Sequence, residues 1–402
     1  MDRRSMLKLA CGGTVGLLVP AMTRSVAYAV PAMADTRFLL VFLRGGYDAA
    51  NVLIPHSSDY YYQVRPNIAV PRDAVLKLDS DWALHPALRE SIYPLWLRGE
   101  AAFVPFAGSH DLSRSHFESQ DTIELGQPLG GGRGYESGFM GRLAGVLGAS
   151  RPIAFTNHMP LAFRGPTPEG AKPVANIALG GAGLRPAAVD PRQSALIAEM
   201  YRDSKLGSPV SEGFAMRESV MRDLSGEMEA AGRNAINARG FELQAKRIAR
   251  LMSAEYNLGF VDVGGWDTHV GEGGANGQLA TRLEELGRGL SALAAGMGSA
   301  WRDTVVVVLS EFGRTFRENG NRGTDHGHGS VYWVLGGAMK GQRVVGEQVR
   351  VSQGTLFQDR DYPVLNEYRE LLAGLLARAY GFDAAQLARV FPSVSPKDVA
   401  LL

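Results

Sequence analysis

One short run of apolar, β-branched side chains constrains the fold of this chain more than any other stretch. It extends from Thr304 to Ser310, with the sequence Thr-Val-Val-Val-Val-Leu-Ser, and polar residues flank it. A run of this kind is typical of a strand buried in a parallel sheet. Ligands of open α/β sheets gather beyond the carboxyl ends of such strands. We therefore expect Glu311 and Arg314, which follow the run, at the edge of the sheet that carries the chemistry.

Two other segments add carboxylates and imidazoles to the same region. One follows a second apolar run, from Phe260 to Val263, and the other is a glycine-rich loop at 323–329. Their candidate metal ligands are Asp267, His269, Asp325, His326 and His328. Taken singly, each has an ordinary structural role, such as a turn cap for an Asp. Taken jointly, with Glu311, this density of carboxylate and imidazole predicts a divalent metal site.

The first buried strand is expected at Arg37 to Leu43, just before the segment Arg-Gly-Gly-Tyr-Asp-Ala-Ala-Asn. Asp48 in this segment is either a further metal ligand at the sheet edge or the cap of a turn. The candidate metal ligands further along the chain favour the role of Asp48 as a ligand. Arg44 and Asn51 are expected to bind substrate.

A serine-rich segment provides the candidates for a nucleophile. Another short strand, Ala101 to Phe106, leads to Ser113, Ser115 and His116. A serine at a strand-to-helix junction gains from the helix N-terminus, which stabilises an anion. The alternative is that the serines only cap the helix, with Glu118 completing a capping box after Ser115. His116 is a candidate acid or base.

The charge of the chain excludes one class of partner. The chain has 402 residues, a formal net charge of +1 and 45% hydrophobic residues, enough to bury a large core. Residues 1–34 hold four basic residues and one acidic residue, so the remainder carries a net charge of −2. Without a basic stripe, we expect no nucleic-acid partner.

The first 34 residues resemble a twin-arginine export signal. Arg3 and Arg4 open it, an apolar stretch follows, and small-residue triplets end at Ala29 and Ala34. Either triplet is a candidate cleavage site, and Ala34 is favoured. The apolar stretch is shorter than the roughly 20 residues of a membrane span, so we expect no stable span after processing. An uncleaved anchor is the alternative. Cleavage would also remove Cys11, the chain's one cysteine.

Beyond the leader, we expect one α/β domain over residues 35–402. Residues 205–257 show a charged helical pattern and are expected to form a helical insertion or cap. Leu279 to Met297 is an amphipathic helix that joins two of the strands above. Val331 to Leu335 is a strand, and Asn366 to Tyr380 a terminal helix.

A series of motifs makes the chain resemble a known family. In order, these are the twin-arginine leader, Leu-Arg-Gly-Gly-Tyr-Asp-Ala-Ala-Asn, Ser-His-Phe-Glu-Ser-Gln-Asp, Gly-Phe-Met-Gly-Arg, Pro-Leu-Ala-Phe-Arg-Gly, Gly-Gly-Trp-Asp-Thr-His, Ser-Glu-Phe-Gly-Arg-Thr and Thr-Asp-His-Gly-His-Gly. The series is similar to the family called domain of unknown function 1501, which is related to the alkaline phosphatase and sulfatase superfamily.

This resemblance implies a fold and a site. The fold would be a three-layer α/β/α sandwich with a mostly parallel central sheet, and the site would hold two metal ions. In that superfamily an Asp after the first strand, a hydroxyl nucleophile, an Asp-and-His pair, a late acidic residue and a histidine loop form the site. The matching positions here are Asp48, Ser113 or Ser115, Asp267 with His269, Glu311, and His326 or His328. The superfamily commonly has Asp-His-Gly after the late strand, where this chain has Glu-Phe-Gly.

The sequence therefore predicts an exported, periplasmic, metal-dependent hydrolase of phosphate or sulfate esters. The metal would be zinc, with manganese, calcium or magnesium as alternatives, and it would polarise a small anionic ester. Arg44 or Arg314 would hold the ester oxygens, unless they form ordinary salt bridges. The twin-arginine export machinery is the expected partner. The alternative function is a non-catalytic, metal-stabilised periplasmic binding protein on the same scaffold.

Overall fold

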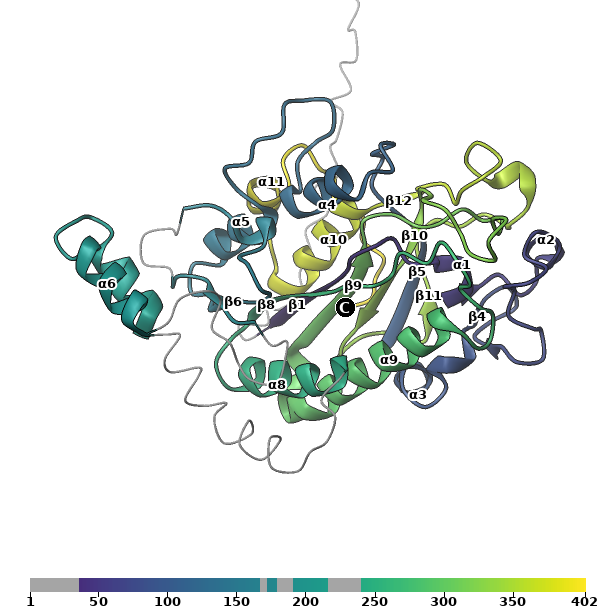
Figure 1. Cartoon of the computed structure of the whole chain (residues 1–402), viewed down its shortest axis with the longest axis horizontal. Coiled ribbons are helices and arrows are strands. Elements are labelled where there is room, and N and C mark those ends of the chain that lie inside the picture. Colours follow the sequence, from purple (N-terminus) through teal and green to yellow (C-terminus); the bar gives the residue numbers. More distant parts are fainter. Residues whose placement is uncertain (1–35, 167–171, 179–190, 216–239) are drawn as a thin grey trace, which may run out of the picture.

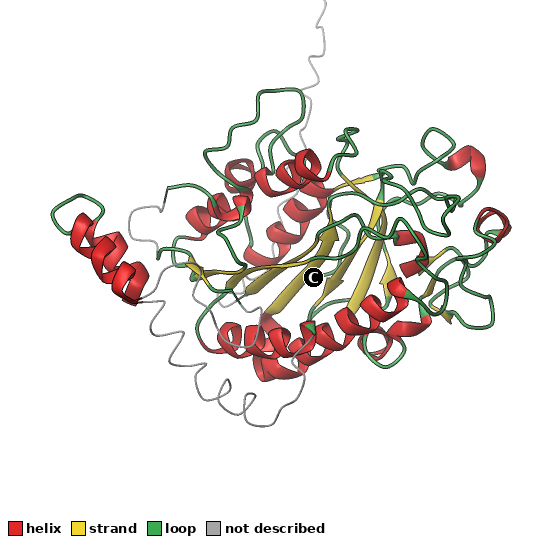
Figure 2. Ribbon diagram, viewed as in Figure 1, coloured by secondary structure: helices red, strands yellow, loops and turns green. Residues whose placement is uncertain are grey.

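The computed structural model describes residues 36–166, 172–178, 191–215 and 240–402. Its centre is a 9-stranded sheet in the order β11-β5-β10-β9-β1-β8-β6-β7, with β12 also paired to β5. Helices cover both faces of this sheet (Figures 1 and 2). The strand bounds are β1 Arg37–Leu43, β5 Ala101–Gly108, β6 Pro152–Phe155, β7 Ala175–Asn176, β8 Leu258–Val263, β9 Thr304–Ser310, β10 Ser330–Leu335, β11 Arg343–Val344 and β12 Asn366–Glu367.

The sheet is mostly parallel, as predicted. β1 pairs in parallel with both β8 and β9, and β8 continues the parallel set with β6. Strand β10 is the exception, because it runs antiparallel to both β9 and β5. Its first residue therefore lies at the edge where the parallel strands end. The loop between β9 and β10 therefore begins and ends at the same edge as the loops after β1 and β8.

The alternation of side chains along β1 explains the two cores. Leu39, Val41 and Leu43 lie in one hydrophobic cluster, whereas Phe38 and Phe42 lie in the other. Each face is apolar because each is covered by helices, which is why these strands are continuous apolar runs. The first face carries α1 Ala49–Val52, α3 Ile92–Leu97, α8 Phe241–Ala254 and α9 Gln278–Met297. The second carries α4 His116–Leu125, α5 Phe139–Leu147, α10 Tyr368–Tyr380 and α11 Ala384–Val390.

Smaller elements lie around this body. A 3-stranded sheet has the order β2-β4-β3. Helix α6 stands apart at the left of Figure 1. None of the described helices is long and apolar enough to cross a membrane. These elements have the bounds β2 Leu53–Ile54, β3 Leu76–Lys77, β4 Ala83–Leu84, α2 Asp59–Val64 and α6 Pro191–Tyr201.

Several predicted elements can be placed. The runs at 37–43 and 304–310 form strands with the expected bounds, and the helix predicted at 279–297 begins one residue earlier, at Gln278. The terminal helix begins at Tyr368 because Asn366 and Glu367 pair with β5 instead. Part of the helical insertion predicted at 205–257 lies outside the described residues. Its last part, α8, packs against α9 in the main helical layer.

Candidate metal centre

The register of the sheet brings distant segments to one place. Leu43, the last residue of β1, is paired with Val263 at the end of β8 and with Ser310 at the end of β9. The loops after these three strands therefore begin side by side. Gly45 is one consequence of this crowding: its φ is +124°, and a Cβ there would lie 2.8 Å from the backbone nitrogen of Asp267.

Three histidines at this edge share one arrangement of their ring nitrogens. Each turns its Nδ1 nitrogen away from the others, toward an oxygen. The pairs are His116 with Glu311 Oε1 at 2.8 Å, His269 with Asp325 Oδ1 at 3.3 Å, and His326 with the carbonyl oxygen of Arg114 at 2.9 Å. A carbonyl or an ionised carboxylate only accepts hydrogen bonds, so Nδ1 carries the proton in the tautomer that makes these three contacts. Each neutral ring is left with a lone pair on Nε2.

These three lone pairs converge on Asp267. The Nε2 atoms of His269 and His326 are 3.2 Å apart, and they lie 2.9 and 3.3 Å from Asp267 Oδ1. His116 Nε2 lies 3.5 Å from Asp267 Oδ2. Two ligand atoms bound to one tetrahedral zinc ion lie about 3.3 Å apart, given zinc–nitrogen bonds of about 2.0–2.1 Å. Each of these distances is therefore of the size expected between two ligand atoms of one cation.

One of the nitrogens makes no hydrogen bond. His116 Nε2 is buried and has no hydrogen-bond partner among the described residues. The ligand atoms of His116, Asp267 and His326 all lie within 4.8 Å of one another. A buried nitrogen lone pair is costly unless a donor or a cation meets it. We conclude that these residues form a possible metal-binding site.

The carboxylate of Glu311 orients the ring of His116. The hydrogen bond that His116 donates to Glu311 raises the pKa of His116, although burial opposes it. Burial alone would raise the pKa of Glu311, but hydrogen bonds from His116, from Gln120 and from the backbone of Gly45 outweigh it and lower the pKa. The ionised Glu311 thus fixes the His116 ring. Partners of this kind on the far side of the imidazole are typical of metal-binding histidines.

Arg314 adds a buried positive charge beside Asp267. Its side chain is 0% exposed, and its Nη1 donates to Asp267 Oδ1 at 2.7 Å. Its Nε donates to Thr324 Oγ1 at 3.2 Å. Its Nη2 has no hydrogen-bond partner in the part of the chain that the structure describes. A guanidinium with one unused donor next to a metal site is suited to bind an anion.

The two candidate nucleophiles differ in their surroundings. Ser113 lies in the turn before α4, and its Oγ lies 3.3 Å from Oγ of Ser119 in the helix. Ser115 is the N-cap of α4 but makes no side-chain cap hydrogen bond, so the expected capping box with Glu118 is not formed. Because Arg114 contacts His326 and His116 follows Ser115, this serine lies between two residues of the cluster.

The backbone before Ser115 has an unusual conformation. Arg114 has a φ of +52°, in the left-handed region that non-glycine residues rarely adopt. Its side chain is held by Asp361, with Nη2 at 2.8 Å from Oδ2. This conformation directs the Arg114 carbonyl toward His326. The sequence carries no signal for it, since nothing marks Arg114 as a left-handed residue.

Some of the residues predicted for the site lie elsewhere. Asp48 is paired with Arg65 in a fully buried ion pair, and Arg65 lies 17 residues further along the chain. Burial would raise the pKa of Asp48, but the Arg65 charge outweighs it and lowers the pKa. Asn51 accepts from Tyr61 at 2.5 Å within the same network. The structure thus gives Asp48 and Asn51 a supporting position rather than a place among the converging atoms.

Two more predicted residues are held by other partners. Arg44 pairs with Asp262 at 2.7 Å and with Glu124 at 2.9 Å, which is the salt-bridging alternative named above. His328 is buried and packs on Phe357 at 4.9 Å between ring centroids. Burial lowers the pKa of His328 to about 4. Neither residue contacts the three converging imidazoles in the described interactions.

Glu311 and Asp325 lie at the site, but behind the histidines. Both were predicted to bind metal directly, whereas each accepts a hydrogen bond from an imidazole Nδ1. The sequence analysis missed Glu272, which is buried below these loops and accepts from Thr268 and Thr324. A charged residue between two glycines, three positions after His269, was the available signal.

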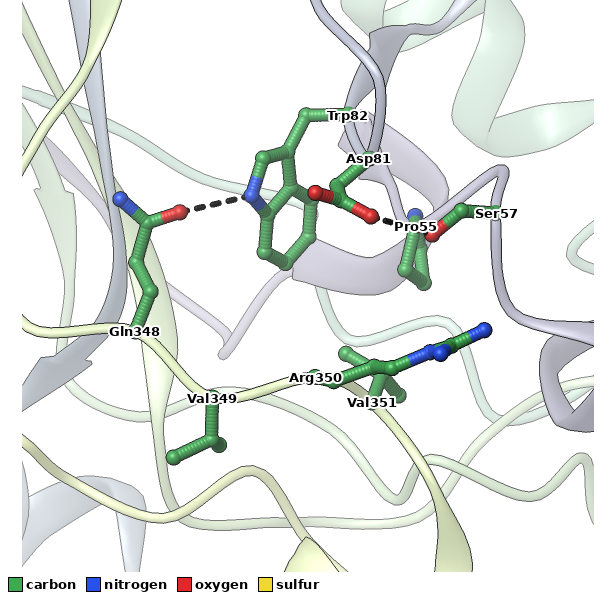
Figure 3. Close-up of a pocket in the computed structure, with 8 residues that line it drawn as sticks. All are labelled: Pro55, Ser57, Asp81, Trp82, Gln348, Val349, Arg350 and Val351. Carbon is green, nitrogen blue, oxygen red and sulfur yellow. Dashed lines mark hydrogen bonds between the residues drawn. The ribbon is translucent and has the colours of Figure 1, made fainter.

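A separate cavity lies away from this cluster. It has a volume of about 500 Å³ and opens between the 55–57 and 81–82 segments and residues 348–351. Figure 3 shows its side chains, with Trp82 donating to Gln348 and Ser57 to Asp81. None of its lining residues belongs to the cluster around Asp267.

Comparison with protein-family models assigns the chain to a family. The model described as "Protein of unknown function (DUF1501)" matches residues 35–391. The chain belongs to this family. No curated protein matches the DUF1501 chain.

Solved structures offer only a weak likeness to this DUF1501 protein. One is titled "Crystal structure of Ps i-CgsB in complex with k-i-k-neocarrahexaose"; it has 10% sequence identity and a TM-score of 0.35, over 88% of this chain and 74% of that one. Another, from work on glycosaminoglycan metabolism by Bacteroides thetaiotaomicron, has 10% identity and a TM-score of 0.31, over 89% and 74%. At these TM-scores the likeness adds nothing to the description of the fold or the site.

The buried Asp48–Arg65 pair generates a prediction about stability. Arg65→Leu leaves the Asp48 carboxylate buried without its cation, so we expect the free energy of unfolding in urea to fall by about 3–5 kcal/mol. Arg72→Leu is the matched control, because Arg72 pairs with Asp59 on the exposed surface. The Arg72→Leu control should lower the free energy of unfolding by at most about 1 kcal/mol. Equal costs for the two variants would contradict a structural role for Asp48.

Proposed function

We propose that this protein is a metal-dependent hydrolase of phosphate or sulfate esters, on a three-layer, alkaline-phosphatase-like α/β/α scaffold. One observation carries the proposal: three imidazoles turn their Nε2 atoms toward Asp267, beside the unused donor of Arg314. A cation and an anion-binding guanidinium side by side are the two elements that hydrolysis of an anionic ester requires.

Asp267, His116, His269 and His326 would hold the cation. This donor set of nitrogens and one carboxylate suits zinc, since magnesium and calcium prefer all-oxygen surroundings. When bound, the cation would supply positive charge that polarises the ester. His116 then belongs to the ligand set, because Glu311 holds its Nδ1 proton and only Nε2 faces the site.

The anionic oxygens of the substrate would be bound by Arg314. The guanidinium is buried, and two of its three nitrogens are already fixed by Asp267 and Thr324. It is therefore oriented before the substrate arrives, so little side-chain entropy is lost on binding. The N-terminus of α4 also favours negative charge at this point.

Ser115 would be the nucleophile. Its hydroxyl lies at the N-cap of α4 and makes no cap hydrogen bond. Attack of Oγ on phosphorus or sulfur would form a serine ester and release the alcohol of the substrate. Water would then cleave the serine ester and release phosphate or sulfate.

Activity of the zinc-loaded protein tests the proposal. We expect turnover of p-nitrophenyl phosphate, bis-p-nitrophenyl phosphate or p-nitrophenyl sulfate. Asp267→Asn should lower kcat/KM by about 10²-fold or more, the scale on which loss of one charge-stabilising group acts. His110→Ala is the matched control and should keep wild-type activity, because His110 is exposed and outside the cluster.

Two results would contradict the proposal. One is turnover by Asp267→Asn equal to that of the wild type, which would place the activity elsewhere. The other is tight zinc binding with no turnover of any of the three esters. That second result would support a metal-stabilised binding protein.

We also propose that the protein acts in the periplasm after twin-arginine export. The support is the leader, which lies outside the described residues. Replacing Arg3 and Arg4 by lysine should keep the precursor in the cytoplasm, as measured by cell fractionation. Arg24→Lys, in the same leader, is the control and should be exported normally. Normal export of the double variant, or recovery of an uncleaved chain in membranes, would contradict this proposal.

A further inference from the structure

Glu272 is a buried carboxyl group to which the proposed reaction assigns no role. It is 0% exposed. Its Oε2 accepts two hydrogen bonds, from Thr268 Oγ1 at 2.9 Å and from Thr324 Oγ1 at 2.9 Å. Burying an ionisable group is costly, so two hydrogen bonds from separate loops call for an explanation.

The two threonines belong to the loops that carry the converging ligands. Thr268 lies between Asp267 and His269, and Thr324 lies two residues before His326. Backbone bonds join the same loops: Thr324 N–H donates to the Thr268 carbonyl at 3.2 Å. Glu272 therefore holds both loops at the positions next to their metal-binding residues.

The same hydrogen bonds reach Arg314. A threonine hydroxyl has one proton, and that of Thr324 is donated to Glu272. Its lone pairs are then available to the Nε–H of Arg314, which donates to it at 3.2 Å. Arg314 in turn donates to Asp267. A continuous chain of contacts thus runs from Glu272 through Thr324 to Arg314 and the centre of the site.

We propose that Glu272 is a positioning residue of the metal centre: it sets the separation of the two ligand loops and the orientation of Arg314. This inference rests on the proposed function, because it presumes that Asp267, His269 and His326 bind a cation. Their ligand atoms are 2.9 to 3.3 Å apart. Loss of the Glu272 carboxyl group would remove the side-chain hydrogen bonds that supplement the backbone bonds between the two loops, and would loosen this spacing. Groups that orient metal ligands typically contribute about 10–100-fold to metal affinity.

Glutamine is the conservative replacement for this residue. The Glu272 carboxyl group also interacts with Asp48, and burial together with Asp48 raises the pKa of Glu272 well above its usual value. A neutral Glu272 and a glutamine have the same shape and both offer a carbonyl oxygen to the threonines. Leucine has a similar volume but no acceptor.

The test measures zinc affinity by competition with a chromogenic chelator, on the mature protein. We expect Glu272→Leu to weaken zinc binding by about 10–100-fold, and Glu272→Gln to stay within about threefold of the wild type. The visible spectrum of the cobalt-substituted protein provides a second readout. It should change in Glu272→Leu and not in Glu272→Gln, because it reports the geometry of the ligands.

Two further variants separate positioning from loss of stability. Leu290→Ala removes a buried side chain of α9, 1% exposed, and should lower stability while leaving zinc affinity unchanged. Thr324→Val removes only the hydroxyl between Glu272 and Arg314, and should weaken zinc binding less than Glu272→Leu. If Glu272→Leu does not fold, Thr324→Val provides the test in its place.

The outcomes distinguish this inference from the proposed function. If the wild type binds no zinc, both are overturned. If it binds zinc and Glu272→Leu or Thr324→Val binds it equally tightly, only the positioning role is overturned. The positioning role would also be overturned if Glu272→Gln lost as much zinc affinity as Glu272→Leu. The same holds if Leu290→Ala lost as much zinc affinity as Glu272→Leu.

Discussion

The hydrogen bonds on the outer side of three imidazole rings are the interactions on which the rest of the site depends. Because Glu311, Asp325 and the Arg114 carbonyl each accept from an Nδ1, the Nε2 lone pairs of all three rings face inward. Without these bonds the rings would rotate, and the lone pairs would not converge on Asp267. The outer partners thus decide which nitrogen is free to bind a cation.

The sheet supplies the framework for this arrangement. The in-register ends of β1, β8 and β9 start their loops together, and the reversed direction of β10 returns the β9–β10 loop to the same edge. Beneath the loops, Arg65, Asp48 and Glu272 form a buried polar layer. Such a layer is stable only when its charges are paired, so it constrains the loops above it.

Much of the fold could be predicted from the sequence, because it follows from local patterns. The strand at 304–310 was predicted with its bounds, since a short apolar, β-branched run flanked by polar residues leaves few alternatives. The placement of Asp267, His269 and His326 at one edge followed from the rule that parallel strands end together. The antiparallel direction of β10 could not be predicted, because its apolar run has the same composition as that of a parallel strand.

The roles of individual residues were harder to predict, for a physical reason. A carboxylate that binds a cation and one that accepts from the histidine behind it differ in position by only a few ångströms. Sequence spacing alone therefore could not show whether Glu311 and Asp325 bind the cation or accept hydrogen bonds from the histidines. Asp48 could not be assigned either, because nothing near it in the sequence shows that Arg65 neutralises it.

The convergence of the three imidazoles on one cation is the central claim, and X-ray absorption at the zinc edge tests it most directly. The protein would be loaded with one equivalent of zinc. The account predicts the scattering pattern of about three imidazoles with one carboxylate oxygen, at bond lengths of about 2.0–2.2 Å. A spectrum with oxygen ligands alone, or with a single imidazole, would contradict it.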